Sequence, residues 1–205
     1  MNGHLSTIVS FMAILNPFAL SLYLQGVMDD LERRQFFRVL LTASIMSLVA
    51  FWVCAAAGEP LLRRGLGVSM PALRAFGGMI FLIIAYNYTI HGYQAAEALR
   101  GSLDELPSAI ALPYMIGAGT ITQSIIVGRD HHLLVSLGLI LGAVIVSFLV
   151  VTAFYVVREM LRRSKEHIFR RYVNMLARLN GLLIGGIAVK MIFTGVHDLW
   201  YGMSQ

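Results

Sequence analysis

Long apolar runs separated by short charged stretches extend over the whole sequence. Six runs contain at most one charged residue each, namely Leu5–Met28, Val39–Ala57, Ala75–Ala96, Leu106–Gly128, Leu133–Val157 and Leu179–Val196. An α-helix needs about 20 apolar residues to cross the hydrocarbon core of a bilayer, and each run is close to that length. The runs are continuously apolar and do not alternate with period two, which argues against the strands of a membrane β-barrel. The pattern therefore predicts an all-α polytopic membrane protein with six transmembrane segments.

The composition supports the membrane class. Of the 205 residues, 58% are hydrophobic and only 13% are charged, and the mean hydropathy is +0.73. Soluble domains usually contain about 25% charged residues. Because the six runs fill the sequence, no room is left for a separate soluble domain.

The positive charges predict an orientation. The net charge of +5 does not indicate nucleic-acid binding, because the basic residues lie in the gaps between the apolar runs. Lys and Arg are retained on the cytoplasmic side of a membrane. With the N-terminus outside, eleven basic residues face inward: Arg33, Arg34, Arg38, Arg100, Arg158, Arg162, Arg163, Lys165, Arg170, Arg171 and Arg178. Four face outward: Arg63, Arg64, Arg74 and Arg129. We therefore expect a bacterial inner-membrane protein with both termini outside, and a first run that is not a cleaved signal peptide.

Two landmarks recur in the same order and indicate an internal repeat. A proline followed by an aromatic residue occurs in Ile14-Leu15-Asn16-Pro17-Phe18 and again, 96 positions later, in Ile110-Ala111-Leu112-Pro113-Tyr114. Arg, Gly and Ile of the stretch from Arg74 to Ile80 align with those from Arg178 to Ile184 at an offset of 104. We expect a first three-helix repeat at residues 1–96 and a second at 97–205, within one membrane domain.

The number of segments in each repeat has a physical consequence. Because each half crosses the membrane three times, the second half must enter it upside down relative to the first. Inverted repeats of this kind are typical of secondary transporters, which bind their substrate near the midplane between the two halves. The organisation thus favours a carrier.

The first and fourth segments are predicted to be broken near their middles. Asn16 followed by Pro17 has the pattern of an N-cap and a first helical residue, so a new half-helix can begin there. In the fourth segment, Gly117-Ala118-Gly119 allows the backbone to bend. Thr120 and Gln123 then have the spacing of a capping box, with Thr120 as the N-cap. The alternative for each break is an ordinary kink satisfied by neighbouring helices.

Broken helices at membrane depth persist only where protein or a polar cavity covers them. The free N–H groups at the start of a half-helix attract an anion, and free carbonyl groups at its end attract a cation. A small zwitterion, which carries a carboxylate and an ammonium group, suits both. This favours a binding site over two simple kinks.

At these residues the sequence resembles the MarC family, which is also described as small neutral amino acid transporters. The stretches that carry the resemblance are Ile14–Phe18, Gly67–Gly78, Gly117–Ile121 and Arg178–Leu183. The resemblance implies a six-helix inner-membrane carrier for amino acids such as alanine and glycine. The substrate residues that it implies are Asn16, Pro17, Phe18, Gly117, Gly119, Thr120 and Thr122, to which the predicted cap adds Gln123. Ala19, Leu22, Ala118 and Lys190 depart from the residues usual in the family, which bears on the substrate more than on the fold.

Three basic residues are candidates for gating or coupling. Arg74 and Arg178 occupy equivalent positions at opposite membrane faces, where each could close one side or simply anchor its helix at the interface. Lys190 lies inside the last run, where an ionisable side chain is costly to bury. It either has a functional role or extends to the outer interface.

The remaining residues disfavour several other functions. Cys54 is the only cysteine, no HExxH spacing occurs, and no run contains Asp or Glu. The sequence therefore predicts no metal, no cofactor and no proton coupling through a buried carboxylate. A membrane enzyme is disfavoured because the candidate nucleophiles have no histidine partner within the membrane; these are Ser44, Ser47, Ser124 and Ser147. A channel or an exporter of another small solute is the remaining alternative.

Gly181 and Gly185 have the small-xxx-small spacing of close helix contact, within the chain or in a homo-oligomer.

Overall fold

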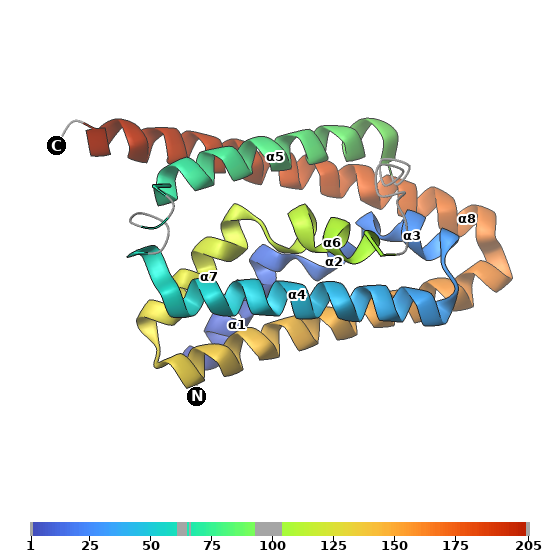
Figure 1. Ribbon diagram of the computed structural model, residues 1–205. Coiled ribbons are helices and arrows are strands. Elements are labelled where there is room, and N and C mark those ends of the chain that lie inside the picture. The colour runs from blue at the N-terminus through green and yellow to red at the C-terminus, as the bar shows by residue number, and fades with distance from the viewer. Residues whose placement is uncertain (1, 61–64, 66, 93–103, 204–205) are drawn as a thin grey trace.

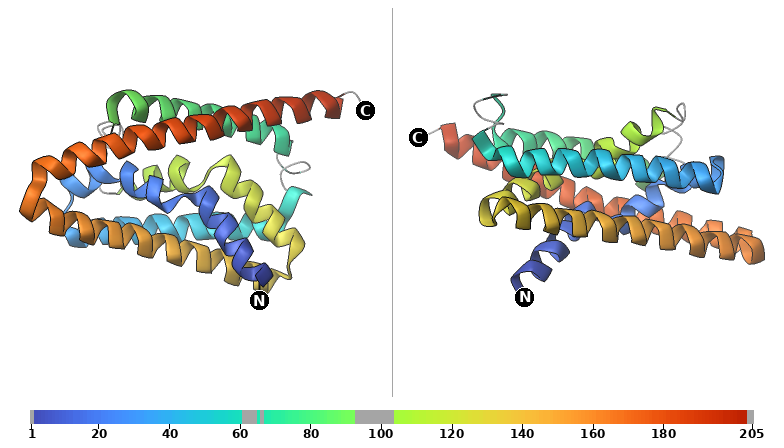
Figure 2. Two further views of the ribbon diagram at one scale, coloured as in Figure 1. Left: turned by 180° about the vertical axis from the view of Figure 1, so that it is seen from behind. Right: turned by 60° about the horizontal axis from the view of Figure 1, so that its bottom comes forward.

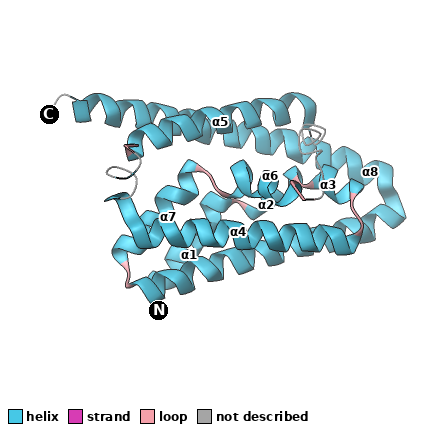
Figure 3. Cartoon of the chain, viewed as in Figure 1, coloured by secondary structure: helices cyan, strands magenta, loops and turns pink. Residues whose placement is uncertain are grey.

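The computed structural model describes residues 2–60, 65, 67–92 and 104–203. All regular elements within these ranges are helices (Figure 3). They are α1 Asn2–Leu15, α2 Pro17–Tyr23, α3 Gln25–Asp30, α4 Arg33–Pro60, α5 Met70–His91, α6 Leu106–Ile110, the π-helical turn η3 Ala111–Met115, α7 Ala118–Asp130 and α8 Leu133–Met203. The predicted all-α class is therefore correct for the described part of the chain.

Most of the predicted segments are long and apolar enough to cross a membrane. Among the described residues these candidate spans are His4–Tyr23, Arg33–Gly58, Met70–His91, Leu133–Leu161 and Arg171–Tyr201. The pair Leu106–Met115 and Ala118–Asp130 is bent by 72° and makes a sixth span if it is counted as one. The structure thus has five or six spans where the sequence predicts six.

The helices form three layers, shown from two directions in Figures 1 and 2. Helix α4 and the first half of α8 form one outer layer, and α5 with the second half of α8 forms the other. The interrupted segments, α1–α3 and α6–α7, lie between them. Helix α8 turns back on itself, so the start of α1 and the end of α8 lie toward the same end of the bundle. Which membrane side that end faces remains a prediction.

The middle layer is buried by apolar contacts. Ile110, Ala111 and Met115, on either side of an irregular stretch of backbone, are at most 2% exposed. They belong to one apolar core that extends from α1 to the first half of α8. Irregular backbone is tolerated at membrane depth when protein surrounds it, and the two outer layers supply that cover.

Close helix contact joins α5 to the second half of α8, and the two run antiparallel. A Cβ atom built on Gly78 would lie 2.9 Å from the carbonyl oxygen of Ala188, and one built on Gly181 would lie 2.9 Å from the amide nitrogen of Thr89. No larger residue fits at either position without movement. Gly181 therefore serves contact within the chain.

The gap between the fifth and sixth apolar runs is helical, because α8 continues through it. The predicted boundary between the repeats, at residues 96 and 97, lies outside the described residues, as do Arg63, Arg64 and Arg100.

Candidate functional site

A cavity of about 370 Å³ lies where the middle layer meets the layer of α5 and α8. It is lined by Ala13, Ile14, Leu15, Asn16, Ala19, Leu20, Tyr23, Arg74, Phe81, Ile84, Tyr114, Ala118, Gly119, Thr122, Gln123, Ile184, Ile187 and Met191. Both interrupted segments contribute to this lining. Sites for small molecules usually have volumes of roughly 300–1,000 Å³, so the cavity suits a small ligand.

The first interruption is made by one residue. Asn16 has a left-handed backbone (φ 44°, ψ 69°), and its side chain accepts a hydrogen bond from the N–H of Ala19 at 3.1 Å. Pro17 follows as the first residue of α2. Because Pro17 has no N–H, the carbonyl of Ala13 loses the donor that a continuous helix would supply. The predicted cap is confirmed, and Ala13, whose carbonyl loses this donor, lines the cavity.

The second interruption is longer. The backbone leaves the helical region at Leu112 (φ −114°, ψ 125°) and is extended again at Ile116 (φ −91°, ψ 96°) and at Gly117 (φ −128°, ψ 172°). Helix α7 begins at Ala118 with Gly117 as its N-cap, three residues before the predicted N-cap Thr120. The first hydrogen bond of α7 runs from the N–H of Ile121 to the carbonyl of Gly117. The N–H groups of Ala118 and Gly119, which line the cavity, therefore precede the helical ladder.

The predicted role of Thr120 as N-cap is wrong. Thr120 is the third residue of α7, and its hydroxyl accepts a hydrogen bond from the N–H of Gly117 at 2.9 Å. The same hydroxyl donates toward the carbonyl of Met115 at 2.9 Å. Thr120 thus forms hydrogen bonds with the irregular backbone that precedes α7. The sequence pattern predicts such a bond for the side chain of Gln123.

The structure brings the two interruptions together. A Cβ atom on Gly119 would lie 2.9 Å from Cγ2 of Ile14, so the start of α7 touches the end of α1. The end of one helix and the start of another therefore border the same cavity.

The candidate substrate residues separate into two groups. Asn16, Gly119, Thr122 and Gln123 line the cavity. The other four, Pro17, Phe18, Gly117 and Thr120, do not line it but shape the two interruptions or point elsewhere. Phe18 is 46% exposed and packs edge-on against Phe154 with ring centroids 6.3 Å apart.

The three basic candidates also separate. Arg74 lines the cavity and forms a half-exposed ion pair with Asp198, with 2.9 Å between Nη1 and Oδ2. Arg178 and Lys190 are exposed and lie outside the cavity lining. Arg74 and Arg178 are predicted to be equivalent, but only Arg74 lines the cavity.

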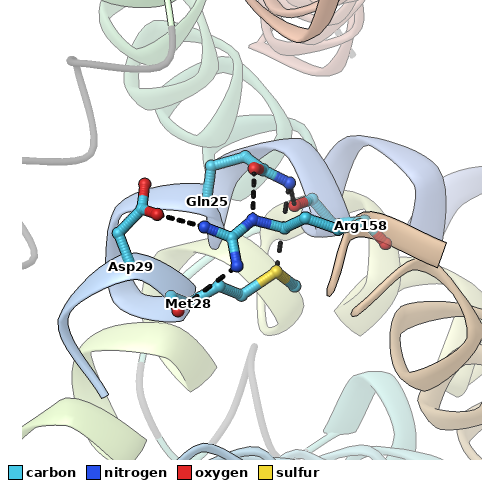
Figure 4. Close-up of polar contacts among 5 residues, drawn as sticks. Gln25, Met28, Asp29 and Arg158 are labelled. Atoms are coloured by element: carbon cyan, nitrogen blue, oxygen red, sulfur yellow. Dashed lines mark hydrogen bonds and ion pairs between the residues drawn. The ribbon is translucent and has the colours of Figure 1, made fainter. Parts of the chain in front are cut away.

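A buried cluster around Arg158 was missed from the sequence, where Arg158 counts only as a basic residue in a gap. The guanidinium group is 3% exposed and donates to the side chain of Gln25 at 3.0 Å, to the carbonyl of Met28 at 3.4 Å and to the carboxylate of Asp29 (Figure 4). These bonds hold the end of the first segment against α8. The signal in the sequence is that Asp29 and Arg158 flank two apolar runs at the same predicted membrane end.

Aromatic residues of the cavity were also missed. The ring of Tyr23 lies 4.2 Å from that of Tyr88 and 5.2 Å from that of Tyr114, measured between centroids. Tyr23 and Tyr114 line the cavity together with Phe81. Tyr114 belongs to the repeated proline–aromatic pair, but no sequence pattern distinguishes Tyr23 or Phe81 from the other aromatic residues of the membrane segments.

Comparisons with known proteins give one family. The sequence model of the family described as "MarC family integral membrane protein" matches residues 1–200 of this chain. A "UPF0056 membrane protein" of Aquifex aeolicus is 26% identical over 202 residues, which cover 93% of this chain and 91% of that protein. The "UPF0056 inner membrane protein MarC" of Escherichia coli O139:H28 is 25% identical, with 94% of this chain and 93% of that protein covered. No solved structure matches the chain.

Proposed function

This chain belongs to the MarC family of integral membrane proteins, and from this membership and its cavity we propose that it is a secondary transporter for small neutral amino acids. It binds its substrate between the two interrupted segments and exposes the cavity alternately to the two sides of the membrane. The family resemblance and the cavity chemistry both support this proposal.

One observation carries the proposal: the two interruptions offer opposite partial charges to one cavity. Ala118 and Gly119, whose N–H groups precede the first hydrogen bond of α7, line the cavity, as does Ala13, whose carbonyl has no donor at Pro17. Each helix end has a partial charge of roughly half an elementary charge. The first suits the carboxylate of an amino acid and the second suits its ammonium group. Arg74 lies one turn before Gly77, which packs against Ala118, and adds a guanidinium group that also pairs with Asp198.

The remaining lining favours a small uncharged side chain. Phe81, Ile84, Ile184, Ile187 and Met191 present apolar surface. The described lining contains no acidic side chain, and its one basic side chain is Arg74. A charged side chain on the substrate would therefore have no counter-charge of its own.

An inverted repeat, which alternating access would use, has independent support. Every buried residue from position 31 to 57 has a buried counterpart 100 positions later, so α4 and the first half of α8 bury the same face. The two helices run in opposite directions (Figure 1). The contacts of α5 with α8 are reciprocal, since Gly78 faces residues 188 and 192 while Gly181 faces residues 85 and 89. These correspondences are those expected of two halves related by an in-plane two-fold axis.

The two ion pairs suit gates at opposite ends. Arg158 and Asp29 lie at one end of the bundle and are largely buried, whereas Arg74 and Asp198 lie toward the other and are half-exposed. We propose that the structure is closed at the Arg158 end and that opening to that side breaks its bonds to the first segment.

A carrier is preferred to an enzyme because the hydroxyls of Ser47 and Ser124 donate to carbonyls of their own helices.

The test is transport by the purified protein in liposomes. Radiolabelled alanine or glycine should enter, and unlabelled amino acid trapped inside should accelerate that entry, because a carrier exchanges substrate across the membrane. Conductance without such counterflow would instead identify a channel. If the liposomes show neither uptake nor conductance with any small neutral amino acid, the proposal is wrong.

A further inference from the structure

Arg74 lies between the cavity and the outside of the protein. It lines the cavity, and its Nη1 atom donates a hydrogen bond to Oδ2 of Asp198 at 2.9 Å. Asp198 does not belong to the cavity lining, and its side chain is 40% exposed. The one basic side chain of the described lining is therefore bound by a carboxylate that lies outside the cavity.

Close packing of α5 against α8 places Asp198 on the outer side of Arg74. A Cβ atom built on Gly195 would lie 2.7 Å from the carbonyl oxygen of Pro71, so the start of α5 contacts α8 there. Because the two helices are antiparallel (Figure 1), the residues that follow Gly195 lie toward the N-terminal end of α5. Asp198, one turn later, therefore approaches Arg74 from that end.

In the other direction along α5, the next turn contacts the start of α7. A Cβ atom on Gly77 would clash with the Cβ atom of Ala118. Gly77 follows Arg74 by about 4.5 Å of helix rise, a distance that the long side chain of arginine can span. Arg74 can therefore reach either Asp198 or a carboxylate bound at the N–H groups of Ala118 and Gly119.

The bond between Arg74 and Asp198 is suited to exchange. Ion pairs between exposed side chains are weak, because water competes for both partners. A carboxylate inside the cavity is less hydrated, so its attraction to the guanidinium group is stronger. The released carboxylate of Asp198 stays solvated, and its Oδ1 atom lies 3.5 Å from Nδ1 of His197. Exchange of one carboxylate for the other thus keeps Arg74 paired and favours the substrate.

We propose that Asp198 competes with the carboxylate of the substrate for Arg74. In the empty protein, Arg74 bonds to Asp198 and joins the start of α5 to the end of α8. When a small neutral amino acid binds, its carboxylate takes the guanidinium group and this link is released. The inference rests on the proposed function and adds that a free carboxylate on the substrate loosens the contact at this end of the bundle.

Competition for uptake in liposomes tests the exchange. Unlabelled alanine and alaninamide, which lacks the carboxylate, are compared as inhibitors of the uptake of labelled alanine. Asp198→Asn frees Arg74, so the alanine concentration that halves uptake should fall about threefold, as expected for loss of an exposed ion pair. The value for alaninamide should not change. Asp130→Asn is the matched control, since Asp130 pairs with Arg129 outside the cavity lining, and both values should equal those of the wild type.

A double substitution separates competition from a structural effect. Arg74→Gln should raise the half-inhibiting concentration of alanine by about tenfold, the worth of one hydrogen bond to a charged group. Adding Asp198→Asn to Arg74→Gln should change nothing further, because Asp198 acts only through Arg74. The rise in Tm that alanine produces in detergent gives the same comparison for variants whose uptake is slow.

Three results would overturn the inference: an unchanged alanine value in Asp198→Asn, equal shifts for alanine and alaninamide, or the same effect of Asp198→Asn with and without Arg74. Each of these leaves the proposed function standing if the wild type still exchanges alanine. Wild-type protein that transports no small neutral amino acid contradicts the proposed function itself.

Discussion

The first and fourth segments are both interrupted, but in different ways. His4–Tyr23 still qualifies as one span of 20 residues, whereas the helices on either side of Ile116 and Gly117 are bent by 72°. In the first segment, Asn16 caps the N–H of Ala19 and Pro17 begins α2 at once, so the interruption is confined to one residue. In the fourth, irregular backbone from Leu112 to Gly117 redirects the chain.

The difference has a chemical consequence. In the first interruption, Asn16 caps the N–H of Ala19 and Pro17 has no N–H, while Ala13, whose carbonyl loses its donor at Pro17, lines the cavity. The second leaves N–H groups at the cavity, while Thr120 satisfies the backbone behind them. Two interruptions that look alike in sequence thus supply opposite charges. A site for a zwitterion needs that asymmetry.

The largest expected effect concerns how the first segment is anchored at its far end. Arg158→Met removes the guanidinium group and leaves the carboxylate of Asp29 and the amide of Gln25 without it. We expect the free energy of unfolding to fall by about 3 kcal/mol, at the lower bound for breaking a buried pair because Asp29 is partly exposed. Thermal or denaturant unfolding in detergent measures this. Arg178→Met, at an exposed position, should change stability by less than about 0.5 kcal/mol; equal losses would mean that Arg158 does not anchor the segment.

A bulky residue at the contact of the two segments should abolish transport. Gly119→Leu places a Cβ atom 2.9 Å from Ile14 and adds a bulky side chain to a residue that lines the cavity. Overpacking costs about 1–3 kcal/mol, so the protein should still insert while uptake falls to background. Gly138→Leu is the matched control, because nothing lies within 4 Å of the Cβ atom there. Normal uptake by Gly119→Leu would show that the cavity is not the site of transport.

The fourth segment should depend on the hydroxyl of Thr120. Thr120→Val leaves the N–H of Gly117 and the carbonyl of Met115 without this partner, which should cost about 1.5 kcal/mol. Thr122→Val is the comparison for unfolding measurements, since the hydroxyl of Thr122 bonds only to the carbonyl of Ala118 in its own helix. A Tm for Thr120→Val as high as that of Thr122→Val would indicate that the irregular backbone is held by other contacts.

The first segment should respond more mildly. Asn16→Ala removes the cap and leaves at a positive φ a residue that, unlike Asn, has no polar side chain to favour the left-handed region, so it should cost about 1 kcal/mol or somewhat more. Asn16→Gly removes the cap but tolerates the backbone, and it should cost only a few tenths of a kcal/mol. Unfolding of both variants, measured in parallel, separates the two terms. Indistinguishable Tm values would mean that the left-handed backbone contributes nothing to the cost.

The accuracy of the sequence-based predictions depends on how local each feature is. The cap at Asn16 is correct because it involves only the residues from Asn16 to Ala19. The cap at Thr120 is misplaced because the preceding stretch from Leu112 is shaped by the surrounding helices. The roles of Arg158 and Tyr23 depend on partners that are far away in the chain, and no local pattern distinguishes them from other basic or aromatic residues.

By itself, the sequence determined the membrane class, the positions of the apolar runs and the interruption at Asn16, because hydropathy and capping act between neighbouring residues. Tertiary structure alone decided that the two interruptions meet at Ile14 and Gly119, and that Arg158 is buried against Asp29, 129 positions away. The physical reason is that the charge presented to a cavity depends on which helix ends are packed together. Helix packing is set by the shapes of distant surfaces, which periodicity along the chain does not record.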